Sequence, residues 1–237
     1  MLRTMWSLAL AASIVALGFA GLLARRWVTA RRPFQAAWVV ALLMYAAASL
    51  ALFLGVLDSW SEAEFRVYWA FGAILNVPWL ALGEGYLLIR RRWVMAASLV
   101  GLVFLTALVI AHVRTAPIQD PAALSHDLPL GREVFGDGST AHRLAQWIAY
   151  PAYALLLAGC VWSAWRMRGR AELRDRFVGT LLIAAGATVV AIGSGVGAGL
   201  DVVPVFTIGL VAGIILMFWG FLRASRPAPM VASREMS

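Results

Sequence analysis

Residues 67–113 read VYWAFGAILNVPWLALGEGYLLI, RRR and WVMAASLVGLVFLTALVIAHV, so two long apolar runs are separated by three arginines. A helix needs about 20 apolar residues to cross a bilayer core of about 30 Å, and each run is long enough to cross once. Only Arg90, Arg91 and Arg92 connect the two runs. The pattern therefore predicts two antiparallel membrane-spanning helices joined by a tight basic turn.

Runs of this length recur along the whole chain. They lie at about 5–24, 36–56, 67–89, 93–113, 143–165, 178–200 and 202–222. Hydrophobic residues make up 62% of the chain and charged residues 14%, whereas soluble domains contain about 45–50% and about 25%. The runs lack the alternation of barrel strands and the polar face of interfacial helices. We therefore predict an all-α membrane protein, with residues 1–237 forming a single seven-transmembrane-helix bundle.

Charge is distributed unevenly between the two sets of loops. Fifteen of the 20 arginines fall on one side of a seven-span chain, and eight of the 12 acidic residues fall on the other. The fifteen are Arg25, Arg26, Arg31, Arg32, Arg90, Arg91, Arg92, Arg166, Arg168, Arg170, Arg174, Arg176, Arg223, Arg226 and Arg234. Because cytoplasmic loops are rich in arginine, we predict the N-terminus outside and the C-terminus cytoplasmic, in a bacterial-type cytoplasmic (plasma) membrane. The first span is then an uncleaved anchor.

Composition excludes several classes of function. All the basic residues in the Lys+Arg total are arginines, and without a lysine amine no retinal Schiff base can form. Cys160 is the only cysteine, which excludes an intrachain disulfide and a cysteine metal cluster. The chain has no P-loop, HExxH, dinucleotide-binding or nucleophile–base motif. We therefore expect a protein that is not an enzyme and has no nucleic-acid partner.

The third span carries the polar residues that we expect to bind a ligand. Asn76 and Trp79 flank Pro78 near the middle of the span, and a proline there predicts a kink with a freed backbone carbonyl. A carboxylate such as Glu84 is costly in hydrocarbon, so it faces the bundle, is protonated or is paired. Together with Tyr86 these residues form the predicted ligand-binding set: Asn76, Trp79, Glu84 and Tyr86. The structural alternative is that Glu84 only pairs with an arginine or a neighbouring helix.

The longest connection, residues 114–142, contains three prolines and three glycines and has no clear helical pattern. Long segments of this kind are usually functional or disordered, and we predict a cap over the outer face. Asp201, between the last two spans, is predicted to cap the seventh helix.

Three histidines form a second candidate site at the outer face. His112 ends the fourth span and His142 begins the fifth, so the two rings could share a metal if these spans are neighbours. His126 could be a third ligand, with Asp120 or Asp127 as a fourth, in a zinc or copper site. The two helix-end histidines could instead flank a haem. No other cofactor is predicted, and the structural alternative is three solvated side chains.

Glycines recur at helical spacing in the last two spans. Gly179, Gly186 and Gly193 are seven residues apart in the sixth span, and Gly209 and Gly213 form a GxxxG pair in the seventh. Small residues allow close backbone approach in lipid, so we predict that these two spans pack tightly together. A homodimer face and a glycine-rich substrate path are the alternatives.

The topology resembles the seven-helix sensory modules that bacteria fuse to kinase or cyclase domains, in span number and orientation only. Because 15 residues follow the last span (223–237), signalling would need a separate partner. We expect a non-enzymatic binding, accessory or sensor-type protein that holds an apolar or amphipathic ligand, or a partner helix, in the bundle. The alternatives are a small proton- or cation-coupled transporter or channel that uses Glu84, and a metal-dependent membrane enzyme at the outer face. Expected partners are the bilayer, anionic lipids at the basic loops, and a partner membrane subunit or a second copy of the chain.

Overall fold

The computed structural model describes residues 2–199 and 203–224, and this part of the chain is helical with no strand. Seven helices in it are long and apolar enough to cross a membrane, which confirms the predicted helical membrane fold. They comprise Ser7–Ala30, Pro33–Asp58, Glu62–Leu88, Arg92–Thr115, Thr140–Met167, Arg174–Gly195 and Val205–Ala224. Asp201, the predicted cap of the seventh helix, lies outside the described residues.

Five of the spans are single α-helices, and two are composite. The single helices are α1 (Leu2–Ala30), α2 (Pro33–Asp58), α5 (Arg92–Thr115), α9 (Arg174–Gly199) and α10 (Val203–Ala224). The third span consists of α3 (Glu62–Val67), the π-helix η1 (Tyr68–Leu75) and α4 (Asn76–Leu88). The fifth consists of α7 (Thr140–Leu144), the π-helix η3 (Ala145–Ala149) and α8 (Tyr150–Met167). Short helical turns complete the chain: η2 (Pro121–Ser125), α6 (Gly131–Val134) and η4 (Ala171–Leu173).

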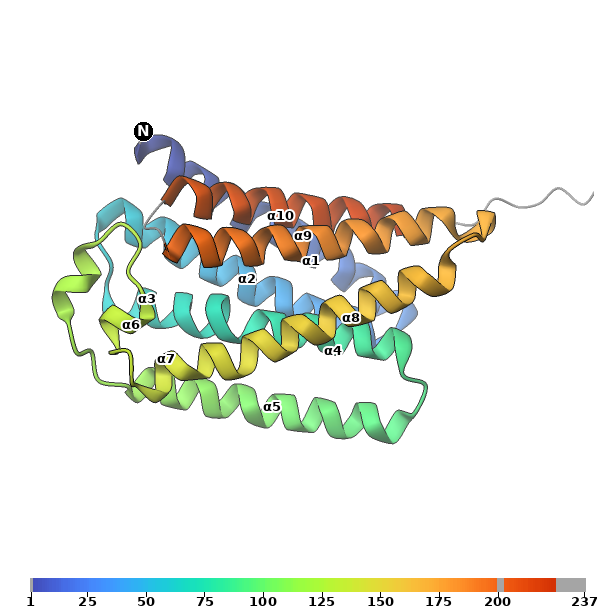
Figure 1. Cartoon of the computed structure of the whole chain (residues 1–237), viewed down its shortest axis with the longest axis horizontal. Coiled ribbons are helices and arrows are strands. Elements are labelled where there is room, and N and C mark those ends of the chain that lie inside the picture. The colour runs from blue at the N-terminus through green and yellow to red at the C-terminus, as the bar shows by residue number, and fades with distance from the viewer. Residues whose placement is uncertain (1, 200–202, 225–237) are drawn as a thin grey trace, which may run out of the picture.

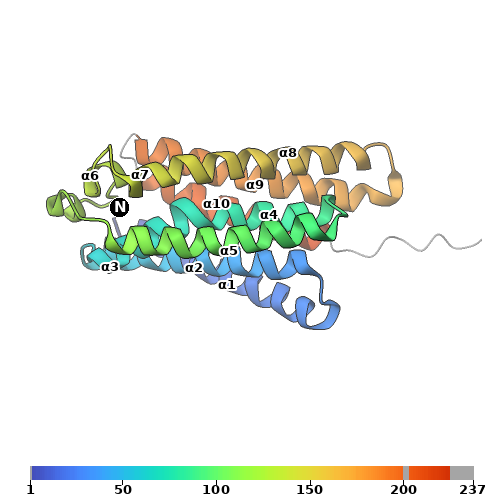
Figure 2. The ribbon, with the colours of Figure 1, turned by 90° about the horizontal axis from the view of Figure 1, so that it is seen from below.

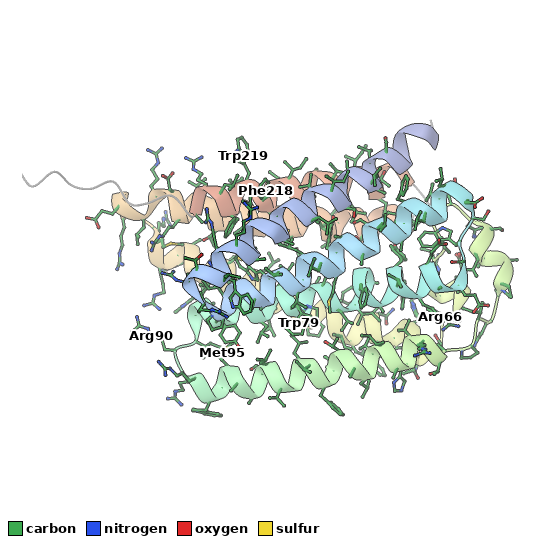
Figure 3. All side chains as sticks on the ribbon, turned by 180° about the vertical axis from the view of Figure 1, so that it is seen from behind. Arg66, Trp79, Arg90, Met95, Phe218 and Trp219 are labelled. Carbon is green, nitrogen blue, oxygen red and sulfur yellow. The ribbon has the colours of Figure 1, made fainter. Side chains whose placement is uncertain are left out.

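The long helices run antiparallel to their chain neighbours in one elongated bundle (Figures 1 and 2). The α1–α2, α4–α5 and α8–α9 connections meet at one end, and because each contains arginines we call it the arginine-rich end. The α2–α3 turn and the segment between α5 and α7 lie at the opposite end, which we call the loop end. Figure 3 labels Arg90 at the first and Arg66 at the second.

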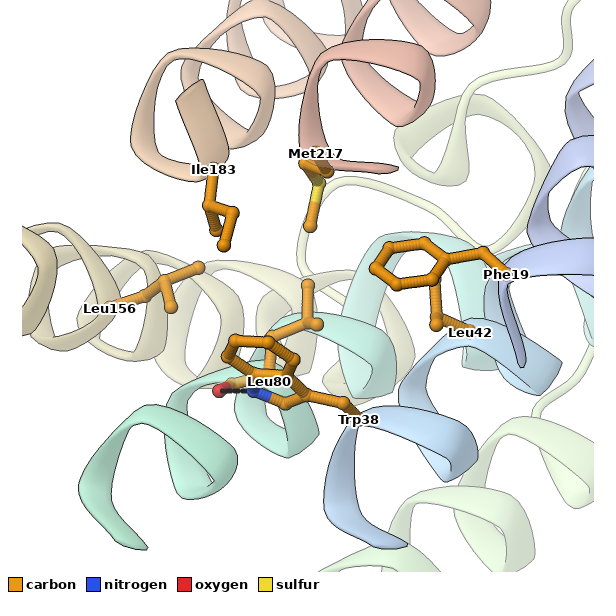
Figure 4. A pocket seen from close by; sticks show the side chains of 7 residues that line it. All are labelled: Phe19, Trp38, Leu42, Leu80, Leu156, Ile183 and Met217. Carbon is orange, nitrogen blue, oxygen red and sulfur yellow. Dashed lines mark hydrogen bonds between the residues drawn. The ribbon is translucent and has the colours of Figure 1, made fainter. Parts of the chain in front are cut away.

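The interior of the bundle is apolar and almost filled. A cavity of about 10 Å³ lies where every membrane-spanning helix except α5 contributes a side chain (Figure 4). Its lining consists of Phe19, Trp38, Leu42, Leu80, Leu156, Ile183 and Met217. A buried water needs at least about 10–15 Å³ of such space and two to four polar partners, so this void is expected to be dry. This void is therefore too small for an organic ligand.

Helix α5 lies at the edge of the bundle. In its most apolar stretch 17% of the residues are buried, compared with 50% in α2 and α10. Its outward side chains are large and apolar: Trp93, Val100, Val103, Phe104 and Ile110. Such a surface suits hydrocarbon, and a water-soluble protein would rarely expose it.

Glycines bring α9 and α10 into backbone contact. A Cβ atom on Gly186 would lie 2.6 Å from the carbonyl oxygen of Gly213, and the Cα atom of Gly209 would lie 2.9 Å from a Cβ atom on Gly193. These distances leave no room for any side chain, and packing at close range is what holds helices together in lipid. The predicted tight pairing of the sixth and seventh spans is confirmed.

The segment between α5 and α7 packs across the loop end. Val134 and Phe135 are fully buried, and the Trp69 indole N–H donates a 2.9 Å hydrogen bond to the carbonyl of Ala141. Gly131 lies against the Trp69 ring, where a Cβ atom would overlap the ring carbons. The predicted 114–142 connection is shorter, because α5 runs to Thr115 and α7 begins at Thr140, and it contains η2 and α6.

Candidate functional site

Each of the two composite spans contains a π-helical segment just before a proline. Segment η1 ends three residues before Pro78, and η3 ends two residues before Pro151. A proline lacks an N–H group and its ring clashes with the carbonyl four residues earlier. In η1 the wider π turn shifts the pairing, so the Asn76 N–H donates to the carbonyl of Phe71. Single π turns inside α-helices are frequent at functional sites.

The two π segments contact each other, and the helices that follow them, α4 and α8, also pack together. Both spans therefore change from π to α geometry at the same level of the bundle. The interface between α4 and α8 lies between this level and the arginine-rich end. It is the part of the bundle in which two interrupted helices meet.

Glu84 lies in this interface and is bonded to α8. Its side chain is 4% exposed, and its Oε1 atom accepts a 2.9 Å hydrogen bond from the Ser163 hydroxyl. No arginine among the described residues forms an ion pair with it. Of the outcomes expected from the sequence, the structure therefore has the hydrogen bond to a neighbouring helix and not the arginine pair.

Gly159 makes the close approach of α8 to Glu84 geometrically feasible. A Cβ atom at this position would lie 2.7 Å from Cγ of Glu84 and 3.2 Å from Cδ1 of Leu88. Gly159 and Ser163 are four residues apart, so they lie on one face of α8. One residue gives Glu84 space and the other gives it a hydrogen bond.

Trp79 and Tyr86 lie on another face of α4. The Trp79 indole N–H donates to the Thr106 hydroxyl of α5 at 3.2 Å. Tyr86 packs against the apolar cluster that contains Trp79 and Met95, and Figure 3 shows Trp79 of α4 and Met95 of α5 in the region between these two helices. The structure therefore does not gather the four predicted ligand-binding residues at one point, because Trp79 and Tyr86 face α5 while Glu84 faces α8.

Asn76 is the least satisfied polar residue of the span. Its side chain is 5% exposed, and its Oδ1 atom has no hydrogen-bond partner among the described residues. Four residues further on, the carbonyl of Leu80 accepts a 3.1 Å hydrogen bond from the Trp38 indole N–H, which ties α2 to α4 (Figure 4). Gly83 accommodates the Trp38 ring, which would overlap a Cβ atom there. The buried Oδ1 atom of Asn76, in contrast, stays unpaired within the described part of the chain, which is energetically unfavourable.

The three histidines do not form a metal site. The Nδ1 atom of His112 is within hydrogen-bond distance of the carbonyl of Leu108 in its own helix. The Nδ1 atom of His126 lies 3.6 Å from Oε2 of Glu133. His142 stacks on the Trp69 ring with a centroid distance of 6.0 Å. No group of three or more His, Cys, Asp or Glu side chains in the described ranges could hold a metal ion. The predicted metal site at these histidines was wrong, because the position of a histidine at the end of a helix does not determine which neighbouring side chain its ring contacts.

Sequence reasoning missed the two α8 residues that define the Glu84 site. Gly159 and Ser163 are small residues with three residues between them, and this small-xxx-small spacing lets membrane helices pack closely. That signal is present in the fifth span and could have named α8 as the helix opposite Glu84. Chemically, the pair is a carboxyl group and a hydroxyl group joined by a hydrogen bond, and either group can exchange its hydrogen-bond partner.

Comparison of the chain with protein-family models, with curated proteins and with solved structures finds no match.

Proposed function

We propose that this chain is a non-enzymatic membrane protein of the binding, accessory or sensor type, and that the α4–α8 interface is its working part. The observation that carries the proposal is the Glu84–Ser163 hydrogen bond between two spans that each contain a π-helical segment. The bond acts as a latch, and the π turns before Pro78 and Pro151 act as hinges.

The energy of the latch suits a reversible contact. Interhelical hydrogen bonds in membranes average about 0.6 kcal/mol and reach about 1.7 kcal/mol. A ligand or a partner helix that offers one donor to Glu84 can therefore replace Ser163 at little cost. Such a ligand would move α4 and α8 apart only if it bound more tightly to a bundle in which the two helices are separated.

The packed interior favours a partner helix or a lipid-like ligand that enters from the side. The central cavity of about 10 Å³ has no room for an organic molecule. Helix α8 exposes large apolar side chains on its outer face, among them Leu155, Trp162 and Trp165. A membrane-dissolved ligand or helix can reach α8 through the bilayer without crossing the bundle.

The location and orientation are part of the same proposal. We place the chain in a bacterial-type cytoplasmic membrane, with the N-terminus outside and the arginine-rich end in the cytoplasm. The gathering of the arginine-containing connections at one end of the bundle supports this orientation. Fusion of a reporter enzyme to either terminus tests it, because activity of a cytoplasmic reporter at the N-terminus would reverse the assignment.

The latch is tested by measuring the distance between α4 and α8 in lipid nanodiscs. Spin labels are attached at Leu87→Cys and Trp165→Cys, because the native side chains at these positions are 50% and 72% exposed. The background variant is Cys160→Ala, which removes the native thiol. We expect Ser163→Ala to broaden or lengthen the α4–α8 distance distribution. Labels at Leu181→Cys and Trp219→Cys report on α9 and α10 as the matched control, and their distance should stay unchanged. An unchanged α4–α8 distribution in Ser163→Ala would overturn the latch.

Binding itself is tested by mass spectrometry of the protein extracted from its own membrane in a mild detergent. We expect a non-covalently bound lipid, quinone or second membrane subunit that is lost in Glu84→Gln/Ser163→Ala. A preparation free of ligand and partner would contradict the binding function.

Proton- or cation-coupled transport through Glu84 is the second candidate. It is favoured by a buried carboxyl group that no arginine neutralises in the described structure. Intramembrane carboxyl groups of this kind often mark ion or proton pathways. Reconstituted vesicles test it: flux that requires Glu84 and is abolished by Glu84→Gln supports transport, and equal flux in both proteins removes it.

A further inference from the structure

A groove of about 410 Å³ lies at the arginine-rich end, where α1 ends and α2 begins. Its walls are formed by Arg25, Arg26, Thr29, Ala30, Arg32 and Gln35. None of the three guanidinium groups forms an ion pair within residues 2–199 and 203–224. Like charges around one hollow repel each other, so an anion bound between them would lower the energy of this end of the bundle.

Gln35 supplies a second observation that points to a ligand. Its side chain is 6% exposed, it lines the groove, and its Oε1 atom has no hydrogen-bond partner in the described part of the chain. A buried amide oxygen without a donor is unfavourable. A ligand for the groove would therefore carry a negative charge for the arginines, and a donor on the same ligand would pair with Gln35 once this side chain turns its buried oxygen toward the groove.

The N-terminus of α2 adds to the attraction for an anion. Pro33 is the first residue of this 26-residue helix, and Arg32 at the N-cap position makes no side-chain capping bond. Pro33 has no N–H group and the Gln35 N–H donates to the carbonyl of Arg32, so the attraction comes from the positive end of the helix dipole, which no N-cap side chain offsets.

The groove is also partly fixed in shape. The Arg26 guanidinium lies 4.9 Å from the centroid of the Phe221 ring, which holds it against α10. The Thr29 hydroxyl donates a 3.1 Å hydrogen bond to the carbonyl of Arg25 and keeps its side chain along the helix. The arginines of the groove are exposed, as are those of the α4–α5 connection, and these two contacts set the groove apart.

We propose that this groove binds the headgroup of an anionic phospholipid that carries both a phosphate and a hydroxyl group, as phosphatidylglycerol does. Guanidinium groups bind the phosphate oxygens, and the headgroup hydroxyl donates to Gln35 Oε1. The membrane spans end at Ala30 and begin again at Pro33, so the groove opens at the depth of lipid headgroups. This site is separate from the α4–α8 interface and stands whether or not the function proposed there is correct.

The site is tested by titrating the detergent-solubilised full chain with phosphatidylglycerol and phosphatidylcholine under native mass spectrometry. We expect preferential binding of phosphatidylglycerol, weakened about tenfold or more in Arg25→Gln/Arg32→Gln. The double variant Arg90→Gln/Arg91→Gln removes the same charge from the same end outside the groove, and its binding should change less than about twofold. Equal losses in both double variants would overturn the site and leave only diffuse surface charge. Unchanged thermal unfolding without lipid confirms that each variant is folded.

Gln35 and the source of the phosphate are tested in two further arms. Phosphatidylethanol carries the same single phosphodiester charge as phosphatidylglycerol but has no headgroup hydroxyl. The wild-type chain should therefore prefer phosphatidylglycerol, and Gln35→Leu should bind both lipids alike. Soluble glycerophosphoglycerol, which is deacylated phosphatidylglycerol, offers the same phosphodiester and hydroxyl groups without acyl chains. Competition by this soluble compound at the concentrations at which the lipid binds would overturn the assignment to a lipid. Loss of discrimination between the two lipids in Gln35→Leu, and not in the wild-type chain, supports the contact between the headgroup hydroxyl and Gln35.

Discussion

Ser163 on α8 donates a 2.9 Å hydrogen bond to Glu84 on α4, and this bond links two membrane spans that each contain a π-helical segment. The pair lies between the level of the two π segments and the arginine-rich end, in an interior where apolar side chains predominate. A polar contact in such surroundings is specific, because few other groups can replace it. Its strength and its role can therefore be measured by substitution.

Ser163→Ala should destabilise the bundle by about 0.6–1.7 kcal/mol, because it leaves Glu84 without its donor in an apolar interface. Glu84→Gln should cost less, since the amide oxygen still accepts from Ser163. Unfolding in mixed detergent–SDS micelles, followed by tryptophan fluorescence, measures both. The double variant supplies the coupling energy, and a coupling near zero would mean that the bond contributes nothing to the interface.

Gly159→Ala should weaken the same interface by steric overlap. The new methyl group would lie 2.7 Å from Cγ of Glu84, so the carboxyl side chain must move away from α8. Overpacking of this kind costs about 1–3 kcal/mol. The same unfolding assay measures it.

Gly101→Ala is the matched control for Gly159→Ala. Gly101 also lies in a membrane-spanning helix, but a Cβ atom there meets nothing within 4 Å. Because alanine favours a helix over glycine by about 0.8–1.0 kcal/mol, this substitution should be neutral or stabilising. Equal destabilisation by both substitutions would show that the cost at Gly159 is not specific to the contact with Glu84.

The contact between α9 and α10 predicts a strong effect at Gly186. Gly186→Ala would place a methyl group 2.6 Å from the carbonyl oxygen of Gly213, and a backbone atom cannot move aside without separating the helices. We expect a loss of about 1–3 kcal/mol. Gly195→Ala on the same helix has open space around it and should cost nothing. If the two variants unfold alike, the pairing of α9 and α10 does not depend on this contact.

Much of the architecture could be predicted from the sequence, because a helix must span the bilayer and the length of each apolar run fixes where it does so. The glycine repeats also identified α9 and α10 as neighbours, since only glycine permits that approach. The bends were harder to predict. Pro78 suggested a kink, whereas the structure places a π-helical segment before it, because the wider turn removes the clash without breaking the helix.

The site was less predictable, because residues of one helix can face different neighbours. Trp79 and Glu84 are close in the sequence, yet one bonds α5 and the other bonds α8. A helical face can be assigned from the sequence only when the neighbouring helices are known. The predicted metal site at the histidines was wrong for the same reason, since the His142 ring stacks on the Trp69 ring.

The cap at the loop end predicts a local effect at Gly131, the residue that lies against the Trp69 ring. In Gly131→Ala the new methyl group overlaps that ring. The indole must then shift, and its hydrogen bond to the carbonyl of Ala141 is lost. We expect faster hydrogen exchange across residues 116–139, measured by mass spectrometry, because the segment opens without unfolding the bundle.

Gly138→Ala is the control within the same segment, since the nearest atom to its Cβ position, Nη2 of Arg143, is 4.0 Å away. Its exchange should match that of the unsubstituted chain. Exchange in α9 and α10 should be unchanged in both variants, because these helices are held by their own glycine contacts. Faster exchange throughout the bundle in Gly131→Ala would contradict a local role, since it would mean that the segment stabilises the whole fold and does more than cover one end.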